Sequence, residues 1–403
     1  MRPGETLELT IDSLAYGGEG IARQGGMVFF VENALRGEKV RVRVREIRKK
    51  FVRAETLEIL TASPDRTEPF CRYFGTCGGC AFQHLAYEKQ LVEKQHMLED
   101  ILRHLGGFRK LEVEPTVASL KPLNYRNHIT LNVEEGRRDF RFGFIAKDNR
   151  TMIEIDSCPI ADTRINFVLP SIRERVGKLP PNQKSRLKKI IVRAGSDGKA
   201  KYEFIQKGSS APPSEPAFTT WVEGMPFHFS MESFFQTNYF ILQRLIHLIK
   251  EMLHPRGQEM LLDLYSGVGF FSILLAKFYS EIVGIEEGRV AVRDARINLE
   301  ANKVSNVKVL SGRVEMILKQ LRSKLKPPIH VIMDPPRLGA DRSVIDFLCF
   351  IPVERLVYVS CEPSILARDL RQLTRSFKIK RIVPLDMFPQ TKHLETVVLL
   401  EPH

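Results

Sequence analysis

The sequence predicts a multidomain α/β protein. Its C-terminal part reads as a doubly wound, mostly parallel sheet, preceded by a small N-terminal β-barrel and a central mixed α+β domain. From about residue 240 onward, apolar strands alternate with amphipathic helices, as in such a sheet. With 403 residues, the chain exceeds what one hydrophobic core usually organises. We therefore expect domains at residues 1–60, 61–235 and 236–403.

The barrel is predicted from short runs of alternating apolar and polar residues between Gly-rich turns, as in ETLELTID, MVFFVEN and EKVRVRVRE. In VRVRVR (40–45) the alternation puts three valines on one face and three arginines on the other. We expect a basic outer surface on a five-stranded barrel. Such barrels bind oligonucleotides, although the same pattern would serve an inert spacer.

The net charge of +13 indicates nucleic acid as the first partner to consider, because a basic surface gains free energy by neutralising phosphates. The excess is concentrated in residues 41–53 and 184–189; a solvated surface is the alternative interpretation. No apolar run reaches the roughly 18 to 20 residues that a bilayer span requires, and the N-terminus lacks a signal-peptide h-region. We expect a cytoplasmic protein without a membrane partner.

The central region begins with a cysteine-rich segment, followed by a predicted amphipathic helix within residues 82–105 that stops at Gly106 and Gly107. Mixed strands and loops are expected from about 111 to 235, and GSSAPPSEPA (208–217) is a loop by composition.

The C-terminal sheet is predicted to contain seven strands, and in such sheets ligands lie at the carboxyl ends of the strands. The strand segments are EMLLDLYS, EIVGIEE, VKVLS, HVIMDPP, RLVYVS, IKRIVPLDM and ETVVLLEP.

LLDLYSGVGFFSILLA (261–276) predicts a strand, a tight turn through Gly267 and Gly269, and a helix. Glu286, at the end of the next strand, is placed to accept hydrogen bonds from ribose hydroxyls. A nicotinamide dinucleotide site would want a third glycine where this chain has Ser272. S-adenosylmethionine has no pyrophosphate to cradle, so we favour it as the cofactor.

Two further strands deliver reactive groups to the same edge. VIMDPPR ends a strand with Asp334, and VYVSCEP ends the next with Cys361. A cysteine ending a buried strand is usually a small core residue, but its position on the ligand side favours a nucleophile. Glu395 opens the last strand, where a glutamate is more often merely exposed.

Together these residues fit one reaction. Carbon 5 of uracil is too weak a nucleophile to attack a sulfonium methyl group directly. Addition of the Cys361 thiolate to carbon 6 would activate carbon 5 for methyl transfer. A general base, Glu395, would then remove the carbon 5 proton so that the thiol can leave. The target base must lie outside its stack.

Seven motifs then make the chain resemble the RNA uridine-5-methyltransferases of the TRAM-domain, iron–sulfur-containing branch: ALRGEKVRVRV, C-x5-C-x2-C, SFFQTN, DLYSGVG, DPPR, VSCEP and LDMFPQTKHLE. The resemblance covers nearly the whole length. It implies a Rossmann-like methyltransferase domain behind an OB-like TRAM barrel. It also implies Cys361 as nucleophile and Glu395 as proton acceptor. Around S-adenosylmethionine, the resemblance and the glycine turn together put Gln236, Tyr265, Gly267, Gly269, Glu286 and Asp334.

The sequence departs from the family at two positions. Many relatives have Asn where this chain has Phe270, and an acidic or amide residue where it has Arg313. Both departures concern cofactor contacts and leave the cysteine and glutamate chemistry unchanged.

The cysteine-rich segment holds Cys71, Cys77 and Cys80, and Cys158 supplies a fourth thiol. Four thiolates can hold one zinc ion or a [4Fe–4S] cluster, and spacing by itself favours zinc. The resemblance implies the iron–sulfur cluster, for which we expect a structural role. Cys349 lies in an apolar helical stretch and is expected in the core.

We expect RNA as the partner, with 23S ribosomal RNA preferred and transfer RNA as the alternative, and we see no sign of an obligate protein partner. Phe234 and Phe235 are candidates for stacking on a flipped base, with Tyr125–Asn127 and His128 as weaker RNA contacts. Less favoured functions are an RNA cytosine-5 enzyme and a non-catalytic RNA-binding iron–sulfur protein. The sequence leaves the target uridine and the oligomeric state open.

Overall fold

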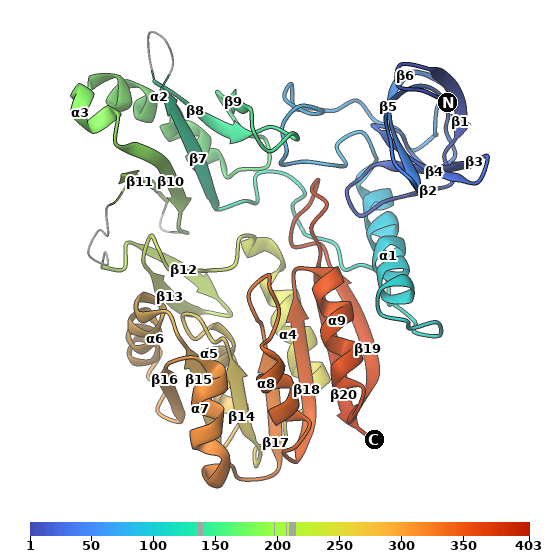
Figure 1. The fold of residues 1–403 in the computed structure, drawn as a ribbon. Helices are drawn as coiled ribbons and strands as arrows, with labels where there is room; N and C mark the ends of the chain where they lie inside the picture. The colour runs from blue at the N-terminus through green and yellow to red at the C-terminus, as the bar shows by residue number, and fades with distance from the viewer. Residues whose placement is uncertain (136–139, 197, 207, 209–214) are drawn as a thin grey trace.

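The C-terminal sheet forms as predicted in the computed structural model, which describes residues 1–135, 140–196, 198–206, 208 and 215–403 (Figure 1). The seven strands lie in the order β16-β15-β14-β17-β18-β20-β19. The first five are parallel, whereas β20 runs antiparallel to both of its neighbours. Their bounds are β14 Met260–Leu264, β15 Glu281–Glu286, β16 Val307–Ser311, β17 Ile329–Met333, β18 Val353–Ser360, β19 Phe377–Leu385 and β20 Glu395–Pro402.

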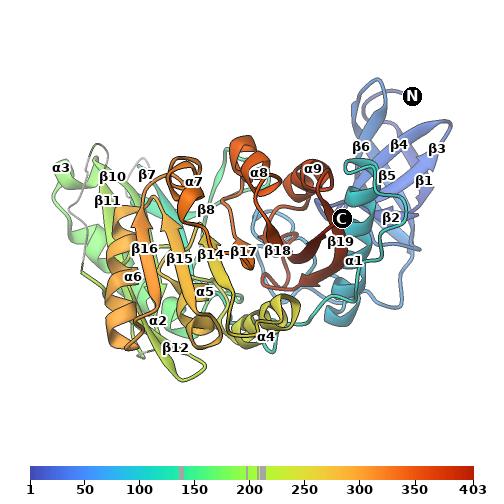
Figure 2. The same ribbon diagram turned by 90° about the horizontal axis from the view of Figure 1, so that it is seen from below.

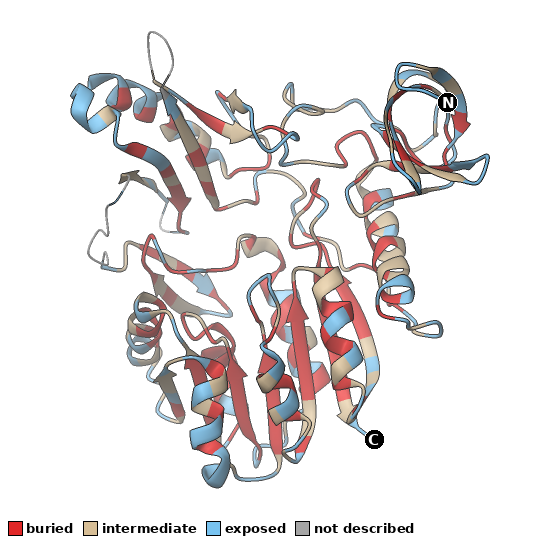
Figure 3. Cartoon of the chain, viewed as in Figure 1, coloured by how far each residue is buried: buried red, intermediate tan, exposed pale blue. Residues whose placement is uncertain are grey.

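Helices cover both faces of this sheet, so its central strands are buried on both sides (Figures 2 and 3). The core on one face includes α4 Leu242–Leu253, α5 Phe270–Leu275 and α6 Arg289–Ala301. The core on the other face includes α7 Val314–Leu321, α8 Arg342–Leu348 and α9 Pro363–Leu373. A hairpin of β12 Phe218–Val222 and β13 Met225–Phe229 packs with the first of these cores.

The N-terminal barrel contains six strands rather than five, because a two-residue strand is added at one end of the sheet. The order is β1-β5-β6-β4-β3-β2, with β1 Thr6–Thr10, β2 Ser13–Leu14, β3 Gly20–Gln24, β4 Met27–Glu32, β5 Lys39–Ile47 and β6 Phe51–Thr61. The three valines of β5 are buried, and its three arginines point outward, as the alternation predicts.

The prediction of a basic outer surface is wrong along β5. Arg41 forms an ion pair with Glu58 of the neighbouring strand, and Arg43 and Arg45 both pair with Glu55. These pairs lie at the surface and contribute little to stability, but the two glutamates offset most of the charge of the three arginines. The sequence pattern of one strand shows the arginines, whereas the cross-strand register decides what lies beside them.

The central domain is built on a five-stranded antiparallel sheet in the order β11-β10-β7-β8-β9. The strands are β7 His128–Glu135, β8 Phe140–Ile145, β9 Met152–Glu154, β10 Leu187–Ala194 and β11 Ala200–Gln206. One face packs against α2 Thr163–Lys178. The sequence did not predict this helix, because it contains Pro170. The short α3 Pro181–Lys184 follows it in the chain. Most of the loop expected at 208–217 lies outside the described residues.

Helix α1 Tyr87–His104 confirms the predicted helix and packs against the C-terminal sheet. Its residues Leu98 and Leu102 belong to the core of the C-terminal sheet, beside α9, rather than to the core of the central sheet. Among the described residues, none of the helices is both long and apolar enough to cross a membrane.

Candidate active site

Cys361 and Glu395, the two proposed catalytic residues, lie where the pairing between strands β18 and β20 ends. Ser360 at the end of β18 pairs with Thr396 of β20, which runs in the opposite direction. Cys361 and Glu395 are therefore the next residues on either side, directly opposite one another at the sheet edge. Opposite residues of an antiparallel pair project to the same side, so the register brings a thiol and a carboxyl together across 34 residues of sequence (395 − 361).

Burial and neighbouring carboxyl groups favour the neutral form of both groups. Burial raises the pKa of Cys361 to about 12, with further increases from Glu395 and Asp334, while the cation of Arg337 opposes them. The pKa of Glu395 also lies well above its ordinary value, first because of burial and then because of Asp334. Only 4% of Glu395 is exposed, and its Oε1 atom has no hydrogen-bond partner among the described residues.

Asp334 lies just after β17 and joins a second segment to the site. Its Oδ2 atom lies 3.5 Å from the Gln236 Nε2 donor, which belongs to the loop after β13. Burial and the nearby Asp263 carboxyl raise the pKa of Asp334 to about 7, whereas hydrogen bonding from Gln236 lowers it. A carboxyl with a pKa near neutrality can exist in both protonation states at physiological pH.

The turn after β14 forms as predicted and is held by Glu286. The glutamate accepts hydrogen bonds from the backbone N–H groups of Gly267 at 3.0 Å and Gly288 at 2.7 Å. Gly269 has a positive φ of 83°, and Tyr265 has the same left-handed backbone with φ of 65° despite its side chain. Such conformations in residues other than glycine cluster at ligand sites.

Ser272 stands where a dinucleotide fingerprint would have its third glycine, and it has a structural role. Its hydroxyl and backbone N–H both donate to Asp263 Oδ2, at 2.6 and 3.0 Å. The start of α5 is thereby tied to the buried end of β14.

A cavity of about 480 Å³ opens beside this turn. Its lining includes Tyr265 and Arg313 together with the loop after β17. Of the other residues expected around the cofactor, Gln236, Gly267, Gly269, Glu286 and Asp334 do not line it. Phe270 is buried in an aromatic cluster with Phe227 and Phe235.

The four cysteines lie together at a second site, in the central domain. Cys71, Cys77, Cys80 and Cys158 all line one cavity of about 390 Å³. Among the described residues, no group of three or more His, Cys, Asp or Glu side chains is close enough to hold a single metal ion. The four cysteines thus share one cavity.

The structure separates the aromatic and polar residues predicted to bind RNA. Phe234 is exposed, whereas Phe235 is a core residue. Tyr125 is buried and donates to the Pro389 carbonyl, and Asn127 is buried and donates to the Gln236 carbonyl. Tyr125 and Asn127 are therefore structural, which corrects their assignment as RNA contacts. His128 lines the cysteine cavity.

Two residues at the site were not found from the sequence. Arg337 comes directly after the two prolines of DPPR. A basic residue so close to the acidic end of a strand could have indicated a role at the site. Tyr16 of the barrel has a buried hydroxyl without a partner among the described residues, and burial together with the charges of Glu362 and Cys361 raises its pKa. Tyr16 is distant from Cys361 in the sequence, so only the tertiary structure shows that the two interact.

Comparison with known proteins agrees with this arrangement of domains. A family model described as tRNA (Uracil-5-)-methyltransferase matches residues 221–403, and a model of the TRAM domain matches residues 2–57. The chain is similar to uncharacterized RNA methyltransferases of Caldanaerobacter subterraneus subsp. tengcongensis and of Protochlamydia amoebophila. Both are 33% identical, over 99% and 98% of this chain and 98% and 97% of the relatives.

A solved structure is similar over the whole length. It is the crystal structure of Pyrococcus abyssi tRNA (uracil-54, C5)-methyltransferase in complex with S-adenosyl-L-homocysteine, with a TM-score of 0.69 and 26% identity over 98% of this chain and 100% of the other. With a barrel, a glycine turn and a Cys–Glu pair at the sheet edge, and with relatives matched from end to end, the chain belongs to the RNA uracil-5-methyltransferase family whose members carry a TRAM domain.

Proposed function

We propose that this protein transfers a methyl group from S-adenosylmethionine to carbon 5 of one uridine in structured RNA, through a covalent adduct between Cys361 and carbon 6. The observation that carries the proposal is the placement of Cys361 opposite Glu395 at the sheet edge, with Asp334 as a close neighbour of both. The similar archaeal enzyme, a tRNA uracil-5-methyltransferase with a demethylated cofactor bound, supports the reaction type.

Each step of the reaction conserves atoms and electrons. Cys361 loses its proton to solvent, its sulfur forms a bond to carbon 6, and the electron pair of the ring double bond makes carbon 5 nucleophilic. When bound, S-adenosylmethionine would supply an electrophilic methyl group to carbon 5, and it would leave as S-adenosylhomocysteine once its methyl–sulfur bond breaks. Glu395 then takes the carbon 5 proton, the double bond re-forms, and the carbon–sulfur bond breaks to release the thiolate.

The electrostatics suit these roles. A carboxylate with a raised pKa is a stronger base than an exposed one, and this property serves Glu395 in the last step. A neutral thiol in the RNA-free protein limits side reactions of Cys361, since the thiolate is the reactive form. Arg337 is the cation that favours ionisation of both groups.

The cofactor is proposed to lie along the carboxyl ends of β14, β15 and β17. Gln236, Tyr265, Gly267, Gly269, Glu286 and Asp334 would surround it, and the cavity beside Tyr265 leaves room for part of it. Because Glu286 already accepts from two backbone N–H groups, its remaining lone pairs are what a ribose would use.

The four cysteines of the central domain are proposed to hold a [4Fe–4S] cluster with a structural role. A cavity lined by four thiols has the ligands for such a cluster, and the resemblance to the iron–sulfur-containing branch favours the cluster over one tetrahedral zinc ion. Burial raises the pKa of Cys77, whereas the hydrogen bond from the Gly79 N–H and the cations of Arg126 and Lys147 oppose this increase.

The preferred substrate is 23S ribosomal RNA, with transfer RNA as the alternative. Mass mapping of 5-methyluridine in ribosomal and transfer RNA from cells lacking the protein tests this proposal. We expect one 5-methyluridine to disappear from 23S ribosomal RNA. Loss of a 5-methyluridine from transfer RNA alone would identify transfer RNA as the substrate. An unchanged set of 5-methyluridines in both RNAs would refute the proposed function.

A further inference from the structure

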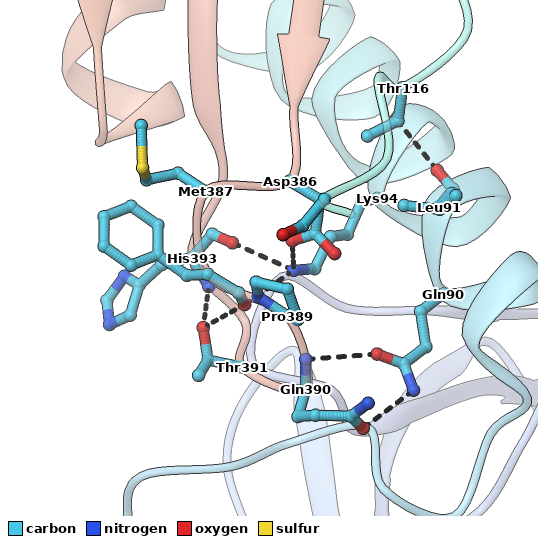
Figure 4. Close-up of polar contacts among 12 residues, drawn as sticks. Gln90, Leu91, Lys94, Thr116, Asp386, Met387, Pro389, Gln390, Thr391 and His393 are labelled. Atoms are coloured by element: carbon cyan, nitrogen blue, oxygen red, sulfur yellow. Dashed lines mark hydrogen bonds and ion pairs between the residues drawn. The ribbon is translucent and has the colours of Figure 1, made fainter. Parts of the chain in front are cut away.

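The loop between β19 and β20, residues 386–394, leads directly into Glu395, and a buried lysine binds both of its ends (Figure 4). Lys94 of α1 is 1% exposed, and its ammonium group donates to Asp386 Oδ1 at 2.6 Å. It also donates to the backbone carbonyls of Phe388 at 3.0 Å and His393 at 3.1 Å. Three acceptors use all three donors of the ammonium group.

These acceptors lie at both ends of the loop. Asp386 comes immediately after β19, and His393 stands two residues before Glu395. Lys94 therefore fixes the distance between the point where the chain leaves the sheet and the point where it returns. Because Glu395 Oε1 has no hydrogen-bond partner among the described residues, the backbone that enters β20 has to set the position of this carboxyl group.

The middle of the loop is fixed by the same helix and by the cysteine-rich segment. Gln90, one turn before Lys94, donates to Gln390 Oε1 at 2.9 Å and accepts from the Gln390 backbone N–H at 3.2 Å. The Gln390 carbonyl accepts from the N–H groups of Ala81 and Phe82 at 2.9 and 3.0 Å. Gln390 has a positive φ of 69°, a conformation that persists where surrounding contacts determine it.

We propose that Lys94 is a positioning residue for catalysis: by holding both ends of the β19–β20 loop, it keeps the Glu395 carboxyl group where it can take the carbon 5 proton. This inference rests on the proposed function, in which Glu395 is the general base. Ala81 comes directly after Cys80, so the same loop also connects the cysteine site to the general base.

A purely stabilising role would be a poor explanation of this arrangement. A buried ion pair adds little net stability, because desolvation of both charges offsets their attraction. Burial lowers the pKa of Lys94, an effect that Asp386 opposes. An apolar pair would fill the same space but could not bind the two loop carbonyls. The ion pair therefore adds hydrogen bonds that fix the loop.

The test uses the double variant Lys94→Met/Asp386→Leu, which removes both charges and so leaves no unpaired charge in the core. A matched control is Arg256→Met/Glu259→Leu, since Glu259 is equally buried but lies at the opposite end of β14, away from the site. Full-length proteins are incubated with S-adenosylmethionine and a transcript of the target RNA. Methyl transfer, the fraction of protein trapped on RNA in denaturing gels, and turnover are then measured.

We expect the Lys94/Asp386 variant to transfer methyl groups in a single turnover but to resolve the adduct about 10- to 100-fold more slowly, so that trapped protein accumulates as in Glu395→Gln. The control variant should show no accumulation. If adduct formation and turnover fell in parallel, or if no excess adduct appeared, the positioning role would be overturned.

A second variant covers failure of the first to fold. Lys94→Gln/Asp386→Asn keeps a polar pair of similar size but shortens the donor, and the same excess of adduct is expected. The proposed function has a separate readout in Glu395→Gln. If this variant traps no RNA, the base assignment fails, and the role of Lys94 fails with it. If it traps RNA while both Lys94 variants behave as the unmodified protein, only the positioning role is refuted.

Discussion

Phe234 and Phe235 are adjacent in the chain but lie in opposite environments: Phe234 is 66% exposed, and Phe235 is 3% exposed. The buried ring stacks on Phe229 with a centroid separation of 4.7 Å. The exposed ring stands two residues before Gln236, which reaches the Asp334 carboxyl group. One ring therefore belongs to the core, and the other is available to a base at the site.

Replacing each ring with alanine should separate these roles. Phe235→Ala should destabilise the protein by about 3–5 kcal/mol through the cavity it leaves. Phe234→Ala should change the free energy of unfolding by less than about 0.5 kcal/mol. It should weaken RNA binding by about 1–3 kcal/mol through loss of stacking. Denaturant unfolding and RNA titration measure the two effects, and wild-type RNA affinity in Phe234→Ala would exclude a stacking role.

Cys361→Ala should abolish methylation, since the variant lacks the thiolate that is proposed to add to carbon 6. Binding of S-adenosylmethionine should be retained, because Cys361 follows β18 and is not among the residues proposed to surround the cofactor. Calorimetric titration of the cofactor and transfer of a labelled methyl group measure both. Full activity in this variant would refute the covalent mechanism.

Glu395→Gln should permit methyl transfer but block proton removal, leaving the protein covalently bound to RNA. The amide is of equal size, so a change in folding is not expected to explain the result. A denaturing gel with labelled RNA shows the adduct. A freely cycling Glu395→Gln enzyme would assign the base elsewhere.

Arg337→Met should shift the pH dependence of activity toward higher pH. The Arg337 cation lowers the pKa of Cys361, so its removal raises that pKa further and reduces the thiolate fraction at every pH below it. We expect kcat/KM at neutral pH to fall about two- to fivefold, the size of an exposed charge interaction, and to recover as pH rises. A uniform loss across the pH range would mean that Arg337 acts only in RNA binding.

Cys80→Ser should reduce the iron content of protein prepared without oxygen and lower its thermal stability, since loss of one ligand disrupts a four-thiolate cluster. Cys349→Ser is the matched control, because Cys349 packs against the core of the C-terminal sheet and does not line the cysteine cavity. Metal analysis and absorbance spectra distinguish iron from zinc. Equal metal content in the two variants would refute the proposal that the four cysteines hold a metal cluster.

The local features of this protein were readable from the sequence alone. The alternation of strands and helices in the C-terminal part, the glycine turn at 267–269 and the alternating valines of β5 depend on residues close together in the chain. The strand ends also indicated which edge carries Asp334 and Cys361, since parallel strands share the direction of their carboxyl ends.

Features that depend on contacts between distant segments required the tertiary structure. The sequence showed the basic row of β5 but not the glutamates that pair with it, and it did not indicate which of the two neighbouring phenylalanines is exposed. Lys94 lies on the same helix face as Leu98. A lysine within an apolar stripe could have been noticed in the sequence. Its partner Asp386, however, is 292 residues away. Only the packing of α1 onto the C-terminal sheet brings the two together, because burial of a charge is decided by what the fold places around it.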